Sequence, residues 1–127
     1  MDLKTAIHEY LRSDSTLISL LDSPTAQPYE IYKSFPKMAV KIPFITFREI
    51  GRTGDFPTSI VFGITAWAKN PDLILNRVRT LMEKHIFSCD EFRDLCCFYE
   101  GGNQESFDED KKCYYRQDRY LIKVLVI

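Results

Sequence analysis

A change of hydrophobic period between residues 59 and 86 constrains the fold more than any other feature of the sequence. From Ser59 to Ala68, apolar residues alternate with others, as in a strand with one buried face. After a short polar switch, apolar residues recur every three or four positions, as on a helix. Asn70 is a preferred N-cap residue and Pro71 suits the first helical position. The segment therefore predicts a strand followed by a helix, from about Pro71 to Ile86, that packs back on the same sheet.

The rest of the chain fits the same scheme of helices packed on a sheet. Asp2 is a good N-cap for a first helix, and Ser13 or Asp14 can cap a short second helix. The strand patterns occupy Tyr29–Tyr32, Pro43–Ile50, Ser59–Ala68, Leu95–Glu100 and Cys113–Ile127. We predict a single α+β domain over residues 1–127, in the order α-α-β-β-β-α-β-β. Its sheet is mainly antiparallel, with the long helix and the N-terminal helices on one face.

The charge balance excludes some classes of partner. Lys and Arg total 17 against 18 for Asp and Glu, which gives a formal net charge of −1. This balance predicts no general affinity for nucleic acid or for anionic lipid. No segment approaches the ~20 apolar residues of a membrane-spanning helix. The amphipathic N-terminus is not typical of an export signal, so we expect a cytoplasmic protein with no membrane partner.

Evidence for catalysis is weak. The chain has four cysteines and two histidines, but no spacing typical of a zinc or redox site. Cys96 and Cys97 stand between apolar residues, which favours buried, reduced thiols. We expect His8 on the solvated side of the first helix. His85 is expected at the C-terminal end of the long helix, where the dipole favours a protonated ring. We therefore expect no catalytic residue, no metal site and no cofactor.

Two polar segments near the C-terminus admit more than one interpretation. The acidic run Asp108–Asp110 lacks the spacing of a calcium loop, so it is expected at the solvated tip of a loop from Gly101 to Lys112. The stretch Tyr114–Tyr120 interleaves tyrosines with arginines, a set that can stack on bases and contact phosphates. Asp118 and the neutral overall charge instead favour cross-strand pairs or a protein interface.

Four segments together resemble a known family. They are "LKTAIHEYLRSDSTLISLL", "IYKSFPKMAVKIPFITFREIG", "IVFGITAWAKNPDLILNRVRTLME" and "YYRQDRYLIKVLV". Their helices, strands and connections are similar to those of the tail-completion or tail-terminator proteins of long-tailed, siphovirus-type bacteriophages and prophages. The likeness extends over nearly the whole chain as a pattern of positions, not as a chemical motif.

The resemblance implies a structural protein, not an enzyme. Members of that family form a hexameric ring on the head-proximal end of the tail tube. There they stop polymerisation of the tube protein and provide the surface on which the head connector docks. DNA passes through the ring without sequence-specific binding. The implied location is the host cytoplasm during assembly and then the head–tail junction of the virion.

A ring requires a head-to-tail contact between different surfaces of each copy. We expect such contacts on the outer face of the third strand, on the last strand and on two loops with apolar tips. The candidate interface residues are Phe35, Met38, Phe56, Val61, Thr65, Trp67, Tyr115, Arg116 and Arg119.

Two alternatives remain open from the sequence alone. One is a small hydrolase that depends on a metal or on a thiol, with Cys96 or Cys113 beside a histidine. The other is an α+β module outside phages that binds a small ligand or a partner protein.

Overall fold

A computed structural model of the chain describes residues 2–21, 31–32, 42–53 and 59–126. The elements, in chain order, are α1 (Leu3–Arg12), α2 (Ser15–Leu20), β1 (Ile31–Tyr32), β2 (Phe44–Arg52), β3 (Ser59–Ala68), α3 (Pro71–Met82), β4 (Ile86–Phe87), β5 (Asp94–Gly102), β6 (Ser106–Asp108) and β7 (Cys113–Val126). This is the α+β domain predicted from the sequence, with β3 at the predicted bounds.

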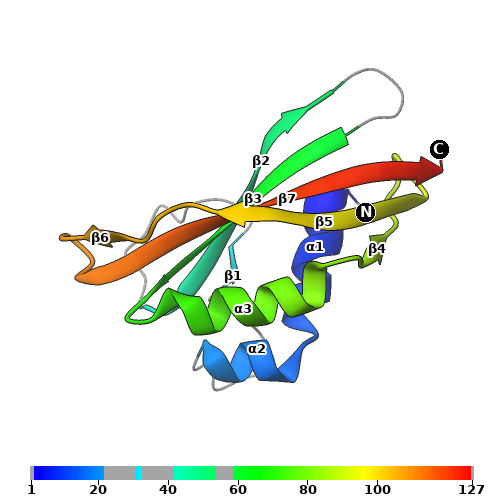
Figure 1. Cartoon of the computed structure of the whole chain (residues 1–127). Coiled ribbons are helices and arrows are strands. Elements are labelled where there is room, and N and C mark those ends of the chain that lie inside the picture. Colours follow the sequence, from blue (N-terminus) through cyan, green and yellow to red (C-terminus); the bar gives the residue numbers. More distant parts are fainter. Residues whose placement is uncertain (1, 22–30, 33–41, 54–58, 127) are drawn as a thin grey trace.

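A mixed sheet of seven strands forms the centre of the fold, in the order β1-β2-β3-β7-β5-β4. Only β1 runs parallel to its neighbour, β2; the other pairs are antiparallel. The long strand β7 pairs with β3, β5 and β6. Strand β6 lies off the main order and pairs with the first residues of β7, so these two strands form a hairpin that projects past α3 (Figure 1).

The helices cover one face of the sheet, which we call the inner face (Figure 1). Alternate residues of β3 and β7, among them Phe62, Ile64 and Tyr120, are buried there against apolar residues of α1 and α3. The opposite face, which we call the outer face, carries the other alternate residues of the same strands. No helix of the described chain lies on it in Figure 1.

Side-chain caps explain where the first two helices begin. Asp2 Oδ1 accepts a hydrogen bond from Thr5 N at 2.8 Å, and Asp14 Oδ2 accepts one from Leu17 N at 2.8 Å. Asn70 occupies the predicted N-cap position of α3, but its side chain makes no capping hydrogen bond. Pro71 at the first helical position and Asp72 in the first turn still favour this start.

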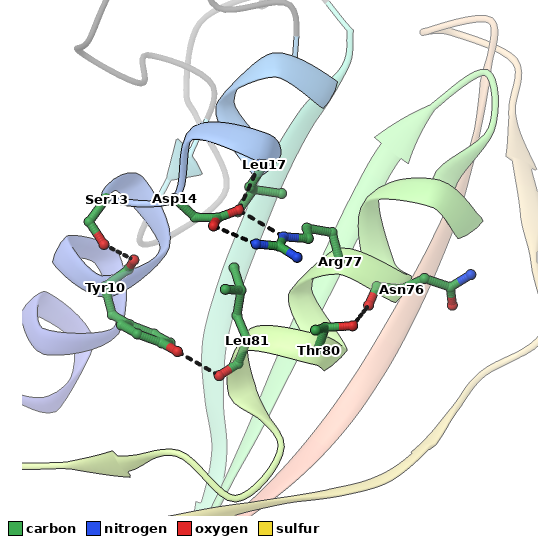
Figure 2. A network of polar contacts seen from close by, with 8 residues as sticks. All are labelled: Tyr10, Ser13, Asp14, Leu17, Asn76, Arg77, Thr80 and Leu81. Carbon is green, nitrogen blue, oxygen red and sulfur yellow. Dashed lines mark hydrogen bonds and ion pairs between the residues drawn. The ribbon is translucent and has the colours of Figure 1, made fainter.

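Two polar contacts join the N-terminal helices to α3 (Figure 2). Tyr10 Oη donates a hydrogen bond to the carbonyl oxygen of Leu81 at 2.8 Å. Asp14, just before α2, pairs with Arg77 of α3. The helical layer is therefore connected by specific hydrogen bonds as well as by apolar packing.

The long helix is shorter than predicted, and His85 is not part of it. Helix α3 ends at Met82, and Lys84 has a positive φ of 62°. Lys84 N donates to Cys97 O at 2.7 Å and Cys97 N donates to His85 O at 3.0 Å. Pairing with β5 thus begins at Lys84, two residues before the predicted helix end at Ile86, which corrects the expectation of a histidine at the helix C-terminus.

The segment Gly101–Lys112 is also more regular than the predicted loop. Strand β5 extends to Gly102, and β6 follows at Ser106–Asp108. Gly101 has a φ of 125°, which L side chains rarely adopt, at a break in the register of β5 with β7. Only the turn between β6 and β7, which contains the acidic residues Glu109 and Asp110, matches the expected loop tip.

Candidate functional site

A row of stacked aromatic rings crosses the outer face at one end of the sheet. Phe44, Trp67 and Tyr115 are neighbours in register on β2, β3 and β7. The ring centroids of Phe44 and Trp67 are 5.7 Å apart, and those of Trp67 and Tyr115 are 4.5 Å apart. Trp67 Nε1 also donates to Thr46 Oγ1 at 3.3 Å. The row forms an apolar platform in which Phe44 is fully buried and Trp67 and Tyr115 are half-buried.

A hollow of about 430 Å³ lies beside this platform on the outer face. Thr46, Thr65 and Gln117 form the next row in register, and Gly63 forms part of the hollow's floor because it has no side chain. A Cβ atom at Gly63 would lie 2.5 Å from Gln117 Nε2, so the Gln117 side chain lies directly over this glycine. The hollow has aromatic residues at one end and polar groups along its sides.

Two exposed arginines flank Gly63 across the sheet. Arg48 of β2 and Arg119 of β7 are both in register with it, and both are exposed. Within the described part of the chain, neither guanidinium group has an ion-pair partner. The next outer row, Val61 and Leu121 with Phe98, is apolar and half-buried. The outer face therefore combines apolar area with unpaired positive charge, as interface surfaces often do.

Arg116 lies on the other side of the sheet from Arg119. It is in register with the buried Ala66, on the inner face, where Nη1 forms an ion pair with Asp72 of α3. Its Nε lies 3.4 Å from Asp118 Oδ1. The structure thus separates the two arginines that the sequence grouped together: Arg116 connects β7 to α3, whereas Arg119 points away from the helices.

Asp118 is the one charged residue in the described chain that is fully buried, with 1% of its surface exposed. Burial raises the pKa of this carboxyl, and the nearby Arg116 opposes that shift. Gly102 lies in register with it, and a side chain at Gly102 would collide with the carboxylate. Tyr120, the next inner-face residue of β7, has its hydroxyl pKa raised by burial and by Asp118. Both residues are enclosed, so they offer no open catalytic site.

The thiols and imidazoles do not form a nucleophile–base pair. Burial raises the pKa of Cys97 and of Cys113, which disfavours the reactive thiolate. His85 stacks on Tyr10 at a centroid distance of 3.7 Å, and burial lowers its pKa. No side-chain hydrogen bond of the described residues joins a cysteine to a histidine, and these residues contain no cluster of three or more metal-ligating His, Cys, Asp or Glu.

His8 has a structural contact that the sequence did not predict. Its Nε2 lies 3.0 Å from the carbonyl oxygen of Ile31, and a carbonyl can only accept, so Nε2 carries the proton. The ring is half-buried, not solvated as expected. It ties α1 to the short edge strand β1.

Of the nine predicted interface residues, Val61, Thr65, Trp67, Tyr115 and Arg119 lie on the outer face. Phe35, Met38 and Phe56 fall outside the described residues.

The sequence analysis missed an aromatic pair on the β6–β7 hairpin. Phe107 and Tyr114 are 48% and 43% exposed, with ring centroids 5.0 Å apart. The signal in the sequence that could have revealed it is Phe107, a phenylalanine inside an acidic, polar segment.

Comparison with known proteins shows a likeness of fold but none of sequence. No family model matches the sequence, and no curated protein matches it. Among solved structures, the fold is similar to a chain from the "Virion of native gene transfer agent (GTA) particle". The TM-score is 0.75 at 14% sequence identity, over 96% of this chain and 93% of that chain. The whole domain therefore shares its fold with a virion component. In the described part of the chain, no helix has the length and apolar character needed to cross a bilayer.

Proposed function

We propose that this protein is a structural component of a phage-type virion that terminates the tail tube. The observation that carries the proposal is the shared fold with a chain of a gene transfer agent virion, which extends over nearly the full length of both chains. The sequence resemblance to tail terminators, in four segments spread along the chain, points to the same role. Fold similarity alone does not define a function, so the proposal also rests on the surfaces.

In this role the protein acts through contacts, not through bond chemistry. Copies of the chain associate head to tail into a ring, as a hexamer in the family it resembles. One side of the ring covers the last layer of tube subunits and ends their polymerisation. The other side receives the head connector. DNA crosses the lumen without sequence-specific binding, and the ring stays at the head–tail junction after assembly in the host cytoplasm.

The outer face is suited to such contacts. Trp67 and Tyr115 of the aromatic platform, which are half-buried, and the apolar row at Val61 offer area to bury, whereas Phe44 is already fully buried. Arg119 and Arg48 offer charges that can select a complementary partner. A hydrolase that uses Cys96 or Cys113 is less consistent with the observed geometry, because both thiols are buried and neither contacts an imidazole through a hydrogen bond.

Electron microscopy of the purified protein, mixed with purified tail tube subunits of the same virus, tests the proposal. We expect rings at one end of the tubes and a shorter mean tube length as the ratio of this protein to tube subunits rises. Tubes with bare ends and unchanged length, at every ratio, would contradict the proposal.

A further inference from the structure

The β6–β7 hairpin ends in an exposed aromatic pair with more carboxylates than lysines around it. Phe107 and Tyr114 pair across the two strands and are both exposed. Around them, Glu105, Glu109 and Asp110 are exposed and have no ion-pair partner among the described residues. We call this set of five residues the hairpin tip. Lys111 and Lys112 lie in the same turn, but the four acidic residues Glu105, Asp108, Glu109 and Asp110 outnumber them. An aromatic pair with this excess of carboxylates favours a partner with both apolar area and positive charge.

The outer face of the same chain has these properties. Its hollow beside Trp67 is lined by Arg48 and Gly63, and by Asn103, Gln104 and Ser106 at another side. Arg119 does not line the hollow, but it is exposed and lies in the same row, in register with Gly63. We call the hollow with its two arginines the arginine trough. The volume of about 430 Å³ is enough to receive aromatic side chains. The trough and the hairpin tip are therefore opposite in net charge, and the hollow has room for an aromatic side chain.

Within one copy, the hairpin borders the hollow through Ser106 and Tyr115, but the aromatic pair of the tip faces away from it. Tyr114 and Arg119 lie on the same continuous strand, β7, so their backbone positions are about 17 Å apart at ~3.3 Å per residue. They also face opposite ways. Tyr114 is in register with Ala68, an inner-face residue, whereas Arg119 is in register with Gly63 on the outer face. A strand cannot fold back on itself, so Phe107 and Tyr114 can reach a trough only in another copy.

We propose that the hairpin tip of one copy binds the arginine trough of the next copy. This inference rests on the proposed ring and identifies the contact that closes it. The hairpin extends past α3 (Figure 1). In the proposed contact its inner-face side lies over the neighbour's outer face, as in the packing of two sheets. Phe107 and Tyr114 enter the hollow, and the carboxylates pair with the two arginines. Because the two surfaces differ, each copy uses both, and the rotation between copies can close into a ring.

Paired charge reversals test this contact. A face-reversed variant carries Arg48→Glu and Arg119→Glu, and a tip-reversed variant carries Glu109→Lys and Asp110→Lys. We expect each variant alone to self-associate about tenfold more weakly than the wild-type protein, measured by analytical ultracentrifugation at low salt, with an unchanged melting temperature. An equal mixture of the two variants should associate again, because each tip then meets a trough of opposite charge. Arg93→Glu, an exposed change just before β5, is the matched control and should associate like the wild type.

The outcomes separate this inference from the proposed function. If the wild-type rings persist in both reversed variants, or if the mixture does not recover, the contact is wrong and the ring still stands. If the reversals behave as expected but tubes remain uncapped, the contact holds and the tail-terminator function fails.

If the wild-type protein associates only when tube subunits are added, the same variants are compared in their presence. Loss of tube binding by monomeric tip-reversed protein would assign the tip to the tube and overturn the contact between copies. A wild-type protein that stays monomeric with and without tube subunits overturns both.

Discussion

Arg77 holds the carboxylate of Asp14 at two points. Arg77 Nη2 donates to Asp14 Oδ1 at 2.7 Å, and Arg77 Nε donates to Asp14 Oδ2 at 2.9 Å (Figure 2). Asp14 Oδ2 also accepts the hydrogen bond from Leu17 N that caps α2. One side chain therefore begins α2 and fixes it to α3, and the hydrogen bond from Arg77 holds the pKa of Asp14 below its usual value.

A substitution of Asp14 that removes both the α2 cap and the ion pair with Arg77 should destabilise the domain. We expect Asp14→Ala to lower the free energy of unfolding by about 0.5–2 kcal/mol, the usual cost of a lost N-cap, measured by urea denaturation at pH 7. Asp14→Ser is the matched control, because serine can still cap the helix but cannot form the ion pair. We expect most of the stability to return with serine. If the alanine and serine variants lose equal free energy of unfolding, the stabilisation comes from the ion pair with Arg77 and not from the cap.

Asp118 should affect the pH dependence of stability in the opposite direction from Asp14. Burial raises the pKa of this carboxyl in the folded state. As the pH rises, the carboxyl therefore ionises at a lower pH in the unfolded chain than in the folded protein. Ionisation then favours the unfolded state, and the wild-type protein loses stability from this group between about pH 4, its ordinary pKa, and the raised folded pKa. We expect Asp118→Asn to become progressively more stable relative to wild type from pH 4 to pH 7, measured by urea denaturation. A difference that stays constant or shrinks over this range would show that Arg116 keeps Asp118 ionised in the folded protein.

The local sequence pattern was enough to locate the elements that carry strong periodic signals. The alternation from Ser59 to Ala68 predicted β3 at the bounds observed. Asp2 was predicted as the first cap and Ser13 or Asp14 as the second, and the structure has Asp2 and Asp14. The end of α3 depends on hydrogen bonds between Lys84 and Cys97, which are remote in sequence, so no local pattern specified it. Strand β6 has three residues and pairs only with β7, which is why it resembled a loop.

The candidate surface was predictable in part. Alternation placed Val61, Thr65 and Trp67 on one face of β3, and the register confirms that shared face. The arginine trough was not predictable, because the sequence does not show that Arg48, Gly63 and Arg119 share a row. The grouping of Arg116 with Arg119 was an avoidable error, since residues three apart on a strand face opposite sides.

The cysteines should differ strongly in their reactivity. Burial raises the pKa of Cys97 and Cys113, whereas Cys89 is half-exposed. We expect a neutral disulfide reagent at pH 8 to modify Cys89 first, with Cys97 and Cys113 reacting only as the protein unfolds, as read from mass spectrometry of tryptic peptides. Fast modification of Cys96 or Cys113 in the folded protein would revive the thiol-dependent alternative.

Substitutions at two residues of the aromatic platform, Trp67 and Tyr115, should affect monomer stability and assembly to different extents. Trp67 stacks between Phe44 and Tyr115 and donates to Thr46, so Trp67→Ala should cost the monomer about 2–4 kcal/mol as well as weaken association. Tyr115 has one stacking partner in this row and is half-buried, so Tyr115→Ala should cost the monomer only about 1 kcal/mol.

If the outer face is a subunit interface, Tyr115→Ala should still reduce ring formation about tenfold or more, by native mass spectrometry at a fixed concentration. Tyr115→Phe keeps the stacked ring and should assemble nearly as the wild type does. Assembly that falls only in proportion to the melting temperature in the alanine variant would mean that the ring supports the fold of one copy and contacts no neighbour.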